Sequence, residues 1–231
     1  RQMCIRDSNK ANVKIKWIDS ETINKKNVGE LLSKAAGILI PGGFGNRGIS
    51  GKIEAIRHAR ENQIPFLGIC LGMQLSIIEF TKNVLKMKNS GSSEFGKHTN
   101  NVISLMTEWS KKNQKVKRTK ENDLGATMRL GSYPCYIKKK SLASKVYKKK
   151  LIHERHRHRY EVNPKYRSSI EKKGLVFSGF SKDKKLLEII ENKNHKWFLG
   201  VQFHPELKSK PFKPHPIFFS FIKNSLINKN A

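Results

Sequence analysis

Two uninterrupted apolar runs, each closed by a glycine-containing turn, organise the first third of the chain. Residues 37–40 stop at a Pro-Gly-Gly turn, and residues 65–70 lead straight into another turn. Short apolar runs bounded by turn residues are typical of strands buried on both faces. Helical spacing of Ile53, Ile56 and Ala59 predicts a helix capped by Ser50, and a further helix is predicted from residue 71 to about residue 82. Strand and helix therefore alternate, which is the pattern of a parallel sheet covered by helices.

The rest of the chain gives weaker signals of the same kind. Period-two alternation predicts a strand over residues 13–18, and a short helix is predicted over residues 28–34. Polar stretches at 86–101 and 110–123 are interpreted as exposed loops, with regular structure resuming near Thr127. Near the end we predict a hairpin from 174–181 and 186–191, a last strand over 197–203, and a closing helix over 216–228. The fold class is therefore α/β, with a mostly parallel central sheet and helices on both faces.

Composition limits the classes of protein and the cellular compartments that fit such a fold. The chain has 231 residues, 37% of them hydrophobic, which suits one large domain. It contains no run of about 18 apolar residues and no charged segment followed by an apolar one, so membrane-spanning and secreted classes are excluded. Its three cysteines, Cys4, Cys70 and Cys135, are odd in number and far apart, which indicates a reducing, cytoplasmic setting.

The charge balance points in another direction. Lys and Arg number 47 against 18 Asp and Glu, a formal net charge of +29, which is typical of proteins that bind nucleic acid. The basic residues form short scattered clusters, as at 138–140 and 148–150, and do not alternate with aromatic residues. No signature of an RNA-binding or helix-turn-helix module accompanies them. We interpret the charge as a lysine-rich surface and expect no specific nucleic-acid partner.

Cys70 occupies the turn between a predicted strand and a predicted helix, with Gly68 and Gly72 two residues to either side. This is the arrangement of a nucleophile elbow, in which small neighbours let a sharp turn present the side chain at the edge of the sheet. The helix dipole at that position is expected to lower the pKa of the thiol. A cysteine that simply fills space in the core is the alternative interpretation.

A base for such a nucleophile follows the last predicted strand. His204 stands at its end, and Glu206 is close enough in sequence to orient the imidazole. Nucleophile, base and orienting carboxylate form the usual logic of a catalytic triad. The Gly42-Gly43 turn supplies backbone N–H groups suited to an oxyanion. Together these features favour nucleophilic acyl transfer.

Arginine and histidine alternate from Arg155 to Arg159. In an extended segment the arginines share one face and the histidines, His156 and His158, share the other. The pattern by itself indicates a basic strand or a weak anion site. No cysteine or carboxylate stands at ligand spacing from these histidines, so we expect no metal site.

These motifs resemble those of class I glutamine amidotransferases. The segments that carry the resemblance are PGGFG at 41–45, GICLGMQ at 68–74 and QFHPE at 202–206. Further segments, TMRLGSYPC, ERHRHRYEV and HPELKSKPFKPHP, are similar to the C-terminal glutaminase domain of the CTP synthase family. The resemblance extends from about Val13 to Lys223.

The resemblance implies a role for each matching residue. Cys70 is implied as the nucleophile that attacks the glutamine carboxamide, His204 as general acid and base, and Glu206 as the orienting carboxylate. The residues implied to bind L-glutamine are Gly43 and Leu71 at the oxyanion, Gly72, Met73 and Gln74 beside them, Glu94 at the amino group and Arg159 at the carboxylate.

The resemblance also implies a partner domain, nucleotide ligands and an oligomeric assembly. In that family the ammonia goes to a synthetase domain that uses ATP, Mg²⁺ and UTP to make CTP, GTP activates the reaction, and the enzyme is a tetramer. We expect no cofactor in the glutaminase domain itself. Residues 12–231 are expected to form this domain without the family's first strand and helix, and residues 1–11 match nothing expected there. The alternatives are a glutaminase of another amidotransferase, a gamma-glutamyl hydrolase, or a basic nucleic-acid-binding protein on the same fold.

Overall fold

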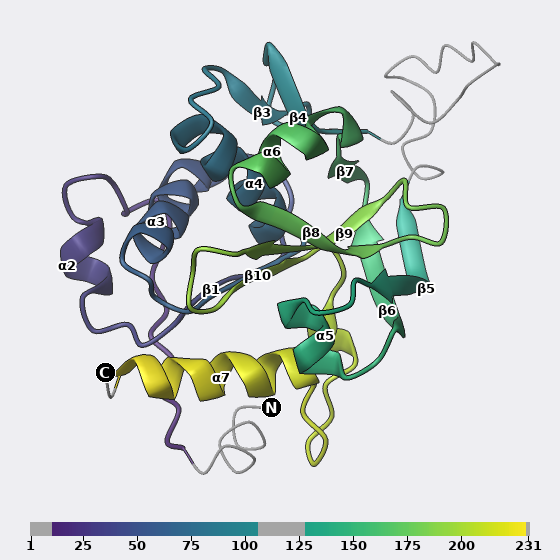
Figure 1. Cartoon of the computed structure of the whole chain (residues 1–231). Coiled ribbons are helices and arrows are strands. Elements are labelled where there is room, and N and C mark those ends of the chain that lie inside the picture. The colour runs from purple at the N-terminus through teal and green to yellow at the C-terminus, as the bar shows by residue number, and fades with distance from the viewer. Residues whose placement is uncertain (1–10, 106–127, 230–231) are drawn as a thin grey trace.

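The computed structural model describes residues 11–105 and 128–229, which form a central sheet with helices against both of its faces (Figure 1). The seven strands of this sheet follow the order β1-β2-β10-β9-β8-β5-β6. Their bounds are β1 Ile38–Ile40, β2 Phe66–Ile69, β5 Arg129–Ile137, β6 Leu151–His158, β8 Leu175–Phe180, β9 Leu187–Asn192 and β10 Phe198–Val201. The predicted α/β class, with helices on both faces of the sheet, is confirmed.

Parallel pairing is confined to one end of this sheet. β2 pairs in parallel with both β1 and β10, and β10 is then followed by four strands paired antiparallel. The predicted hairpin is formed by β8 and β9. A short turn can join two neighbouring strands only when they are antiparallel, so this hairpin lies in the antiparallel part of the sheet. Cys70 and His204 follow β2 and β10, so both emerge at the carboxyl edge of two adjacent parallel strands.

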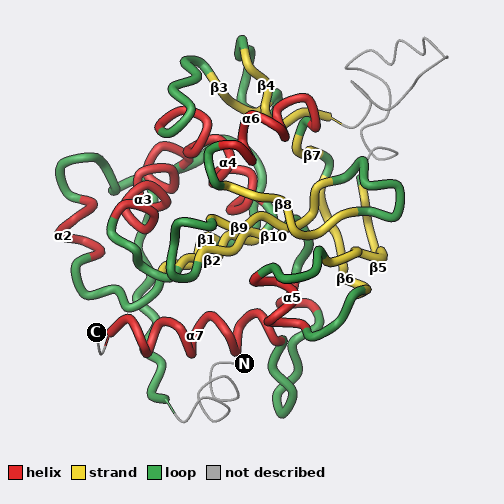
Figure 2. The backbone as a smooth tube through the Cα atoms, viewed as in Figure 1, coloured by secondary structure: helices red, strands yellow, loops and turns green. Residues whose placement is uncertain are grey.

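Each face of the sheet has its own apolar core. Phe66 packs into the cluster under α2 (Val28–Leu32), α3 (Ile49–Glu61) and α4 (Leu71–Asn83). Its neighbour Leu67 packs into the opposite cluster, under α5 (Leu142–Tyr147) and α7 (Pro216–Lys229). This alternation is what a strand buried on both faces requires. In Figure 2 the two groups of helices lie on opposite sides of the yellow sheet.

A small second sheet extends the side of the molecule next to α4. Its order is β3 (Ser90–Ser92), β4 (Asn100–Leu105) and β7 (Tyr160–Val162). The prediction of an exposed loop over 86–101 is therefore wrong in part, because Ser90, Gly91 and Ser92 are buried and paired with β4. Short polar residues gave no hydrophobic signal for this strand. The turn that follows β7 contains η3 (Pro164–Tyr166) and α6 (Arg167–Lys172), and η4 (Pro205–Leu207) follows β10.

Two further expectations about the early chain are corrected. Residues 13–18 form no strand, and Trp17 is 87% exposed, so the alternation there reflects no buried face. Ser50 does not cap α3; the N-cap is Gly48 in a left-handed conformation (φ 64°), which glycine adopts without strain. The predictions for residues 1–10 and 110–123 lie outside the described residues.

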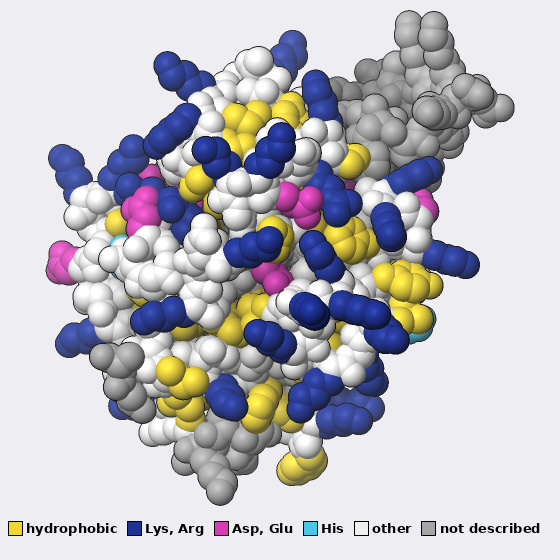
Figure 3. Space-filling view, in the orientation of Figure 1, with side chains coloured by type: hydrophobic (Ala, Val, Ile, Leu, Met, Phe, Trp, Pro, Cys, Tyr) yellow, Lys and Arg dark blue, Asp and Glu magenta, His cyan; other side chains and the backbone are white. Residues whose placement is uncertain are grey.

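The surface carries its positive charge broadly. Lys and Arg side chains are spread over the face in Figure 3 and interrupted by only a few Asp and Glu. Among the described helices, none is long and apolar enough to cross a membrane.

Candidate active site

Cys70 sits in a strained turn between β2 and α4. Its φ of 52° and ψ of −102° lie in a region that residues other than glycine rarely adopt. The backbone N–H of Cys70 donates to the Val201 carbonyl at 2.7 Å, which ties the turn to β10. A Cβ on Gly68 would lie 2.7 Å from the Gly72 carbonyl group, so both flanking glycines are needed where the helix begins. The predicted elbow is therefore the geometry observed.

His204 and Glu206 form a tight pair directly after β10. His204 Nδ1 lies 2.6 Å from Glu206 Oε1, and the backbone N–H of His204 donates to the Arg155 carbonyl at 2.8 Å. A carboxylate only accepts, so Nδ1 carries the proton. Nε2 is then an acceptor; it is buried, and within the described residues it has no hydrogen-bond partner. The imidazole is thus oriented with a free lone pair.

Gly42 lies beside the side chains of both His204 and Cys70. A Cβ built on Gly42 would be 2.8 Å from His204 Cε1 and 3.5 Å from Cys70 Cβ. The same construction on Gly43 would reach Leu71 Cδ2 at 3.3 Å, so this turn runs over the start of α4. The loop after β1 therefore packs against both Cys70 and His204.

The electrostatics of Cys70 differ from the sequence-based expectation. Burial raises the pKa of the thiol to about 12, and the nearby carboxylates of Glu206, Glu161 and Glu94 act in the same direction. A hydrogen bond from the Leu71 backbone N–H lowers the pKa by more than any one of these carboxylates raises it, but burial outweighs this hydrogen bond. The helix N-terminus therefore does not hold Cys70 as a thiolate, because the side chain is only 2% exposed.

Glu94 and Arg159 supply one charge of each sign near this space. Glu94 Oε1 accepts from the Gly45 backbone N–H at 2.9 Å, in the loop that carries Gly42 and Gly43. Burial raises the pKa of Glu94, and the positive charge of Arg159 partly reverses that shift, so the two side chains act on each other. Arg159 Nε is buried and has no partner among the residues described. A guanidinium in this position has donors to spare for a ligand.

The first turn of α4 contains four of the residues predicted to bind glutamine, which are Leu71, Gly72, Met73 and Gln74. The side chain of Met73 is fully buried in the core, so Met73 can offer only backbone groups. Gly72 likewise offers only its backbone, and no larger residue fits there because a Cβ would collide with the Ile40 carbonyl. The first N–H groups of a helix have no partner within it, as is true of Leu71 here. Gln74 uses its amide within the protein: Nε2 donates to the Tyr160 carbonyl at 3.0 Å and to Gln202 Oε1 at 3.2 Å.

The sequence of the domain matches a known protein family over nearly its whole length. The family model for glutamine amidotransferase class-I matches residues 2–224. The chain belongs to this family. Among curated relatives, the CTP synthase of Pelagibacter ubique is 59% identical over 215 residues, covering 93% of this chain and 40% of the relative. The CTP synthase of Rhodospirillum rubrum is 50% identical over 219 residues, covering 95% of this chain and 40% of the relative.

A solved structure narrows the relationship within the class I amidotransferases. The glutaminase domain of Trypanosoma brucei CTPS with bound acivicin superposes with a TM-score of 0.86 at 36% identity, covering 97% of this chain and 86% of that one. The chain is thus a class I amidotransferase domain of the CTP synthase type. It spans about 40% of the length of the curated relatives it matches.

Sequence reasoning missed two parts of this amidotransferase site. Gln202 was only part of a motif, yet its Nε2 donates to Cys70 Sγ at 3.8 Å. No role was predicted for Arg129, yet it is buried and forms ion pairs with Glu161 and Glu188, each at 2.8 Å. These residues come from four separate strands or loops, and no spacing along the chain signals that they meet. Among the described residues no three His, Cys, Asp or Glu side chains gather in a way that suits a metal ion.

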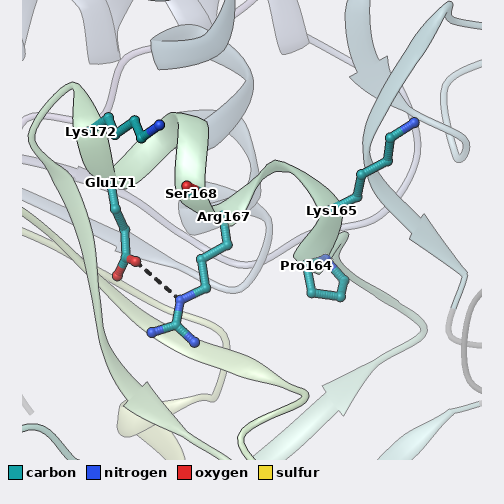
Figure 4. A pocket seen from close by; sticks show the side chains of 6 residues that line it. All are labelled: Pro164, Lys165, Arg167, Ser168, Glu171 and Lys172. Carbon is teal, nitrogen blue, oxygen red and sulfur yellow. Dashed lines mark hydrogen bonds and ion pairs between the residues drawn. The ribbon is translucent and has the colours of Figure 1, made fainter.

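A pocket in the described part of the chain lies away from these residues. Its volume is about 550 Å³, and it is lined by η3 and α6, from Pro164 to Lys172. Figure 4 shows Arg167 turned back to Glu171, with which it forms an ion pair of 3.2 Å, while Lys165 points away from both. None of the residues discussed above lines it, so we place the chemistry at Cys70 and not in this pocket.

Proposed function

We propose that this domain hydrolyses the side-chain amide of L-glutamine, with Cys70 as nucleophile, His204 as general acid and base, and Glu206 as the carboxylate that orients His204. One observation carries the proposal. The imidazole of His204 has its Nδ1–H held by Glu206 and its Nε2 without a partner among the described residues, and both the imidazole and Cys70 lie directly beside Gly42. This is the relationship that a base must have to an activated nucleophile.

The reaction follows from these positions. Cys70 Sγ attacks the amide carbon while the thiol proton passes to His204 Nε2, and the carbonyl oxygen becomes an oxyanion. His204 returns that proton to the amide nitrogen, the C–N bond breaks, and ammonia leaves a glutamyl thioester on Cys70. A water molecule then attacks the thioester, giving one proton to His204. Collapse of this second intermediate releases glutamate and returns the proton to the thiol.

The raised pKa of Cys70 sets the order of events. A thiol with a pKa of about 12 is protonated at neutral pH, so the proton must leave for His204 as the S–C bond forms. The N–H groups of Gly43 and Leu71 are proposed to receive the oxyanion, since the Leu71 N–H is directed at the Cys70 thiol and the Gly43 turn packs against the Leu71 side chain.

Recognition of glutamine is assigned to charges of opposite sign. We propose that Glu94 binds the α-ammonium group, that Arg159 binds the α-carboxylate, and that the backbone of Gly72, Met73 and Gln74 lines the side-chain amide. The mutual influence of Glu94 and Arg159 supports a zwitterion placed between them. The unpartnered Nε of Arg159 supports the same assignment.

The relatives suggest where the ammonia goes. Because they are CTP synthases, we propose that the ammonia reaches a synthetase domain of the same enzyme, where ATP with Mg²⁺ activates UTP for amination to CTP. GTP is proposed as the activator, a homo-oligomer as the assembly, and the cytoplasm as the compartment. The free thiol that the reaction needs fits such a reducing compartment.

Covalent labelling tests the assignment of Cys70. The chain is incubated with acivicin, the compound named in the trypanosomal structure, and its cysteine peptides are analysed by mass spectrometry. We expect an adduct on Cys70 that glutamine prevents, and none on Cys135, which is the matched control because it is also buried and free. Release of ammonia and glutamate in equal amounts is measured in parallel for the chain and for Cys70→Ala. Labelling that glutamine does not prevent, or hydrolysis retained by Cys70→Ala, would contradict the proposal.

A further inference from the structure

Two buried histidines form a hydrogen-bonded line behind the site. His156 and His158 project from the same face of β6 and are 1% and 2% exposed. His156 Nδ1 lies 2.8 Å from His158 Nε2, and His158 Nδ1 lies 3.2 Å from the Tyr160 carbonyl oxygen. Neither ring contributes to the reaction as derived above. Their geometry nevertheless determines where every proton in this line must be.

The tautomers follow from the acceptor at one end. The Tyr160 carbonyl only accepts, so His158 must carry a proton on Nδ1, and its Nε2 is then an acceptor when the ring is neutral. His156 must therefore donate from Nδ1, which leaves its own Nε2 as an acceptor. Burial lowers the pKa of both rings, to about 2 for His156 and about 3 for His158, which agrees with neutral imidazoles. The line has a direction, with each Nδ1–H pointing toward Tyr160.

The other end of the line meets a carboxyl group. His156 Nε2 lies 3.6 Å from Glu188 Oε2, and each of these two atoms is buried without a hydrogen-bond partner in the described part of the chain. An unprotonated nitrogen and an ionised carboxylate would repel each other there. A proton on Glu188 Oε2 removes the repulsion and supplies a donor for His156. The carboxyl group turns easily about its last torsion, so such a proton would draw the two atoms together.

The charges around Glu188 favour that proton. Arg129, from β5, pairs with both Glu188 and Glu161, so two buried carboxylates share one guanidinium. Holding one proton makes the cluster neutral, which a buried site strongly favours. Burial raises the pKa of both carboxyls, to about 7 for Glu161. Among the described residues the unpartnered acceptor His156 Nε2 lies beside Glu188, whereas the ring nitrogen beside Glu161 is His158 Nδ1, which carries a proton already. The other titratable groups that act on His156 are His158 and His204, and the other one that acts on Glu188 is Cys135.

The near end of the line leads to glutamine recognition. The Tyr160 carbonyl accepts from both His158 and Gln74, so the residues on either side of Arg159 are anchored. Gln74 continues through Gln202 to Cys70 Sγ. Arg159 itself lies between β6 and β7, outside both strands, and its direction depends on these anchors.

We propose that His156 and His158 are positioning residues: they form a directed Nδ1–H relay from a proton on Glu188 to the Tyr160 carbonyl, and this relay fixes Arg159 where the carboxylate of glutamine binds. The role of Arg159 rests on the function proposed above. The relay itself does not, so the two can be tested apart.

The first experiment reads the tautomers directly. Two-bond ¹H–¹⁵N correlation spectra of the chain labelled with ¹⁵N-histidine separate Nδ1–H, Nε2–H and cationic rings, and single His156→Asn and His158→Asn variants assign the signals. We expect both rings to be neutral with the proton on Nδ1. An Nε2–H tautomer of either ring, or a cationic ring at neutral pH, would overturn the relay.

The second experiment separates the two hydrogen bonds of His158. In His158→Asn the amide N–H takes the place of Nδ1 and keeps the bond to Tyr160, whereas in His158→Gln the amide takes the place of Nε2 and loses that bond. We expect His158→Gln to raise KM for glutamine about tenfold with a smaller change in kcat, and His158→Asn to recover most of the loss. Equal KM values for the two variants, with unchanged thermal transitions, would refute the positioning role.

The third experiment tests the proton on Glu188. At alkaline pH the unchanged chain should lose this proton, and KM for glutamine should rise. Glu188→Gln carries a permanent N–H donor for His156 and an oxygen for Arg129, so its KM should lack that alkaline rise. A parallel rise in both would overturn the assignment. If the unchanged chain hydrolysed no glutamine, the proposed function would fail, and the NMR spectra would still decide the relay.

Discussion

Gly42 and His204 are so close that a single methyl group could not be placed between them: a Cβ on Gly42 would lie 2.8 Å from the imidazole carbon Cε1. Real Cβ atoms essentially never approach a ring this closely, so the ring or the loop would have to move. The imidazole would lose its alignment with Cys70 or its bond to Glu206.

We therefore expect Gly42→Ala to lower kcat for glutamine hydrolysis about 100-fold, since displacing a reacting group by about 1 Å has an effect of that size. Gly29→Ala is the matched control, because nothing lies within 4 Å of its Cβ in helix α2. It should keep full activity and gain about 0.5–1 kcal/mol in unfolding free energy. Equal kcat values for the two variants would show that the space beside His204 does not matter.

The triad residues should differ in their effects when removed. His204→Ala should reduce kcat about as severely as Cys70→Ala, because both the attack and the departure of ammonia use the imidazole. Glu206→Ala should be milder, since Glu206 is bonded to His204 Nδ1 at 2.6 Å and acts through the imidazole. Steady-state kinetics on thermally stable variants gives the ranking. A larger loss in Glu206→Ala than in the other two would reverse the assigned roles.

Glu94→Gln separates charge from shape. Its side-chain oxygen can still accept from the Gly45 N–H, so the loop should keep its position. Loss of the negative charge should raise KM for glutamine about tenfold or more, with little change in kcat, because a charge-assisted bond to the α-ammonium group is lost. A matched measurement uses a glutamine analogue without the amino group. That compound should not distinguish the variant from the unchanged chain.

The buried histidines should make the fold sensitive to acid. Their pKa values are lowered to about 2 and about 3, so the unfolded chain takes up protons below pH 6.5 that the folded chain does not. Stability is therefore complete above pH 6.5 and falls as the pH drops toward 3, by up to about 1.4 kcal/mol per pH unit for each histidine. His158→Asn should show a shallower loss between pH 6 and pH 4 in urea unfolding. His153→Asn, which removes an exposed ring from the same strand, is the control, and equal slopes would exclude burial as the cause.

The net charge of +29 should give weak binding to any DNA or RNA. Scattered lysines neutralise phosphates without contacting base edges, so the affinity should fall steeply with salt and be the same for unrelated sequences. Fluorescence anisotropy with two oligonucleotides of different sequence, titrated with salt, measures both effects. A sequence preference that persists at about 0.2 M salt would support the nucleic-acid-binding alternative.

The sequence predicted the strands in which the order of apolar and polar residues matches the order of buried and exposed positions. The runs that became β2 and β10 are buried on both faces, whereas β1, at the edge of the sheet, leaves Leu39 exposed. The alternation in β6 correctly separated exposed Arg155 and Arg157 from buried His156 and His158. The motifs around Cys70, Gly43 and His204 were found because each chemical group has a short local signature. Local patterns therefore gave both the strand ends and the residues that stand on them.

Other features depend on contacts between distant segments and could not be predicted in this way. Residues 13–18 alternate but pair with no described strand, while β3 is a strand made of Ser and Gly. The thiol pKa was misjudged because burial outweighs the helix N-terminus. The Arg129 cluster is assembled from β5, β7 and β9, and a charged residue in a strand pattern looks like a surface position until the fold is known.

The parallel pairing of β2 with β10 also has a consequence for how the domain folds. Cys70 and Gln202, which touch in the native state, are separated by 132 positions in the chain. Contacts of such long range form late, because the intervening loop must first be closed. The thiol should therefore remain without its base until β10 docks, so a nascent or partly refolded chain is catalytically silent even when α4 and its turn are already formed. In stopped-flow refolding, glutaminase activity should return only with the slowest phase that buries Trp197, the residue next to β10.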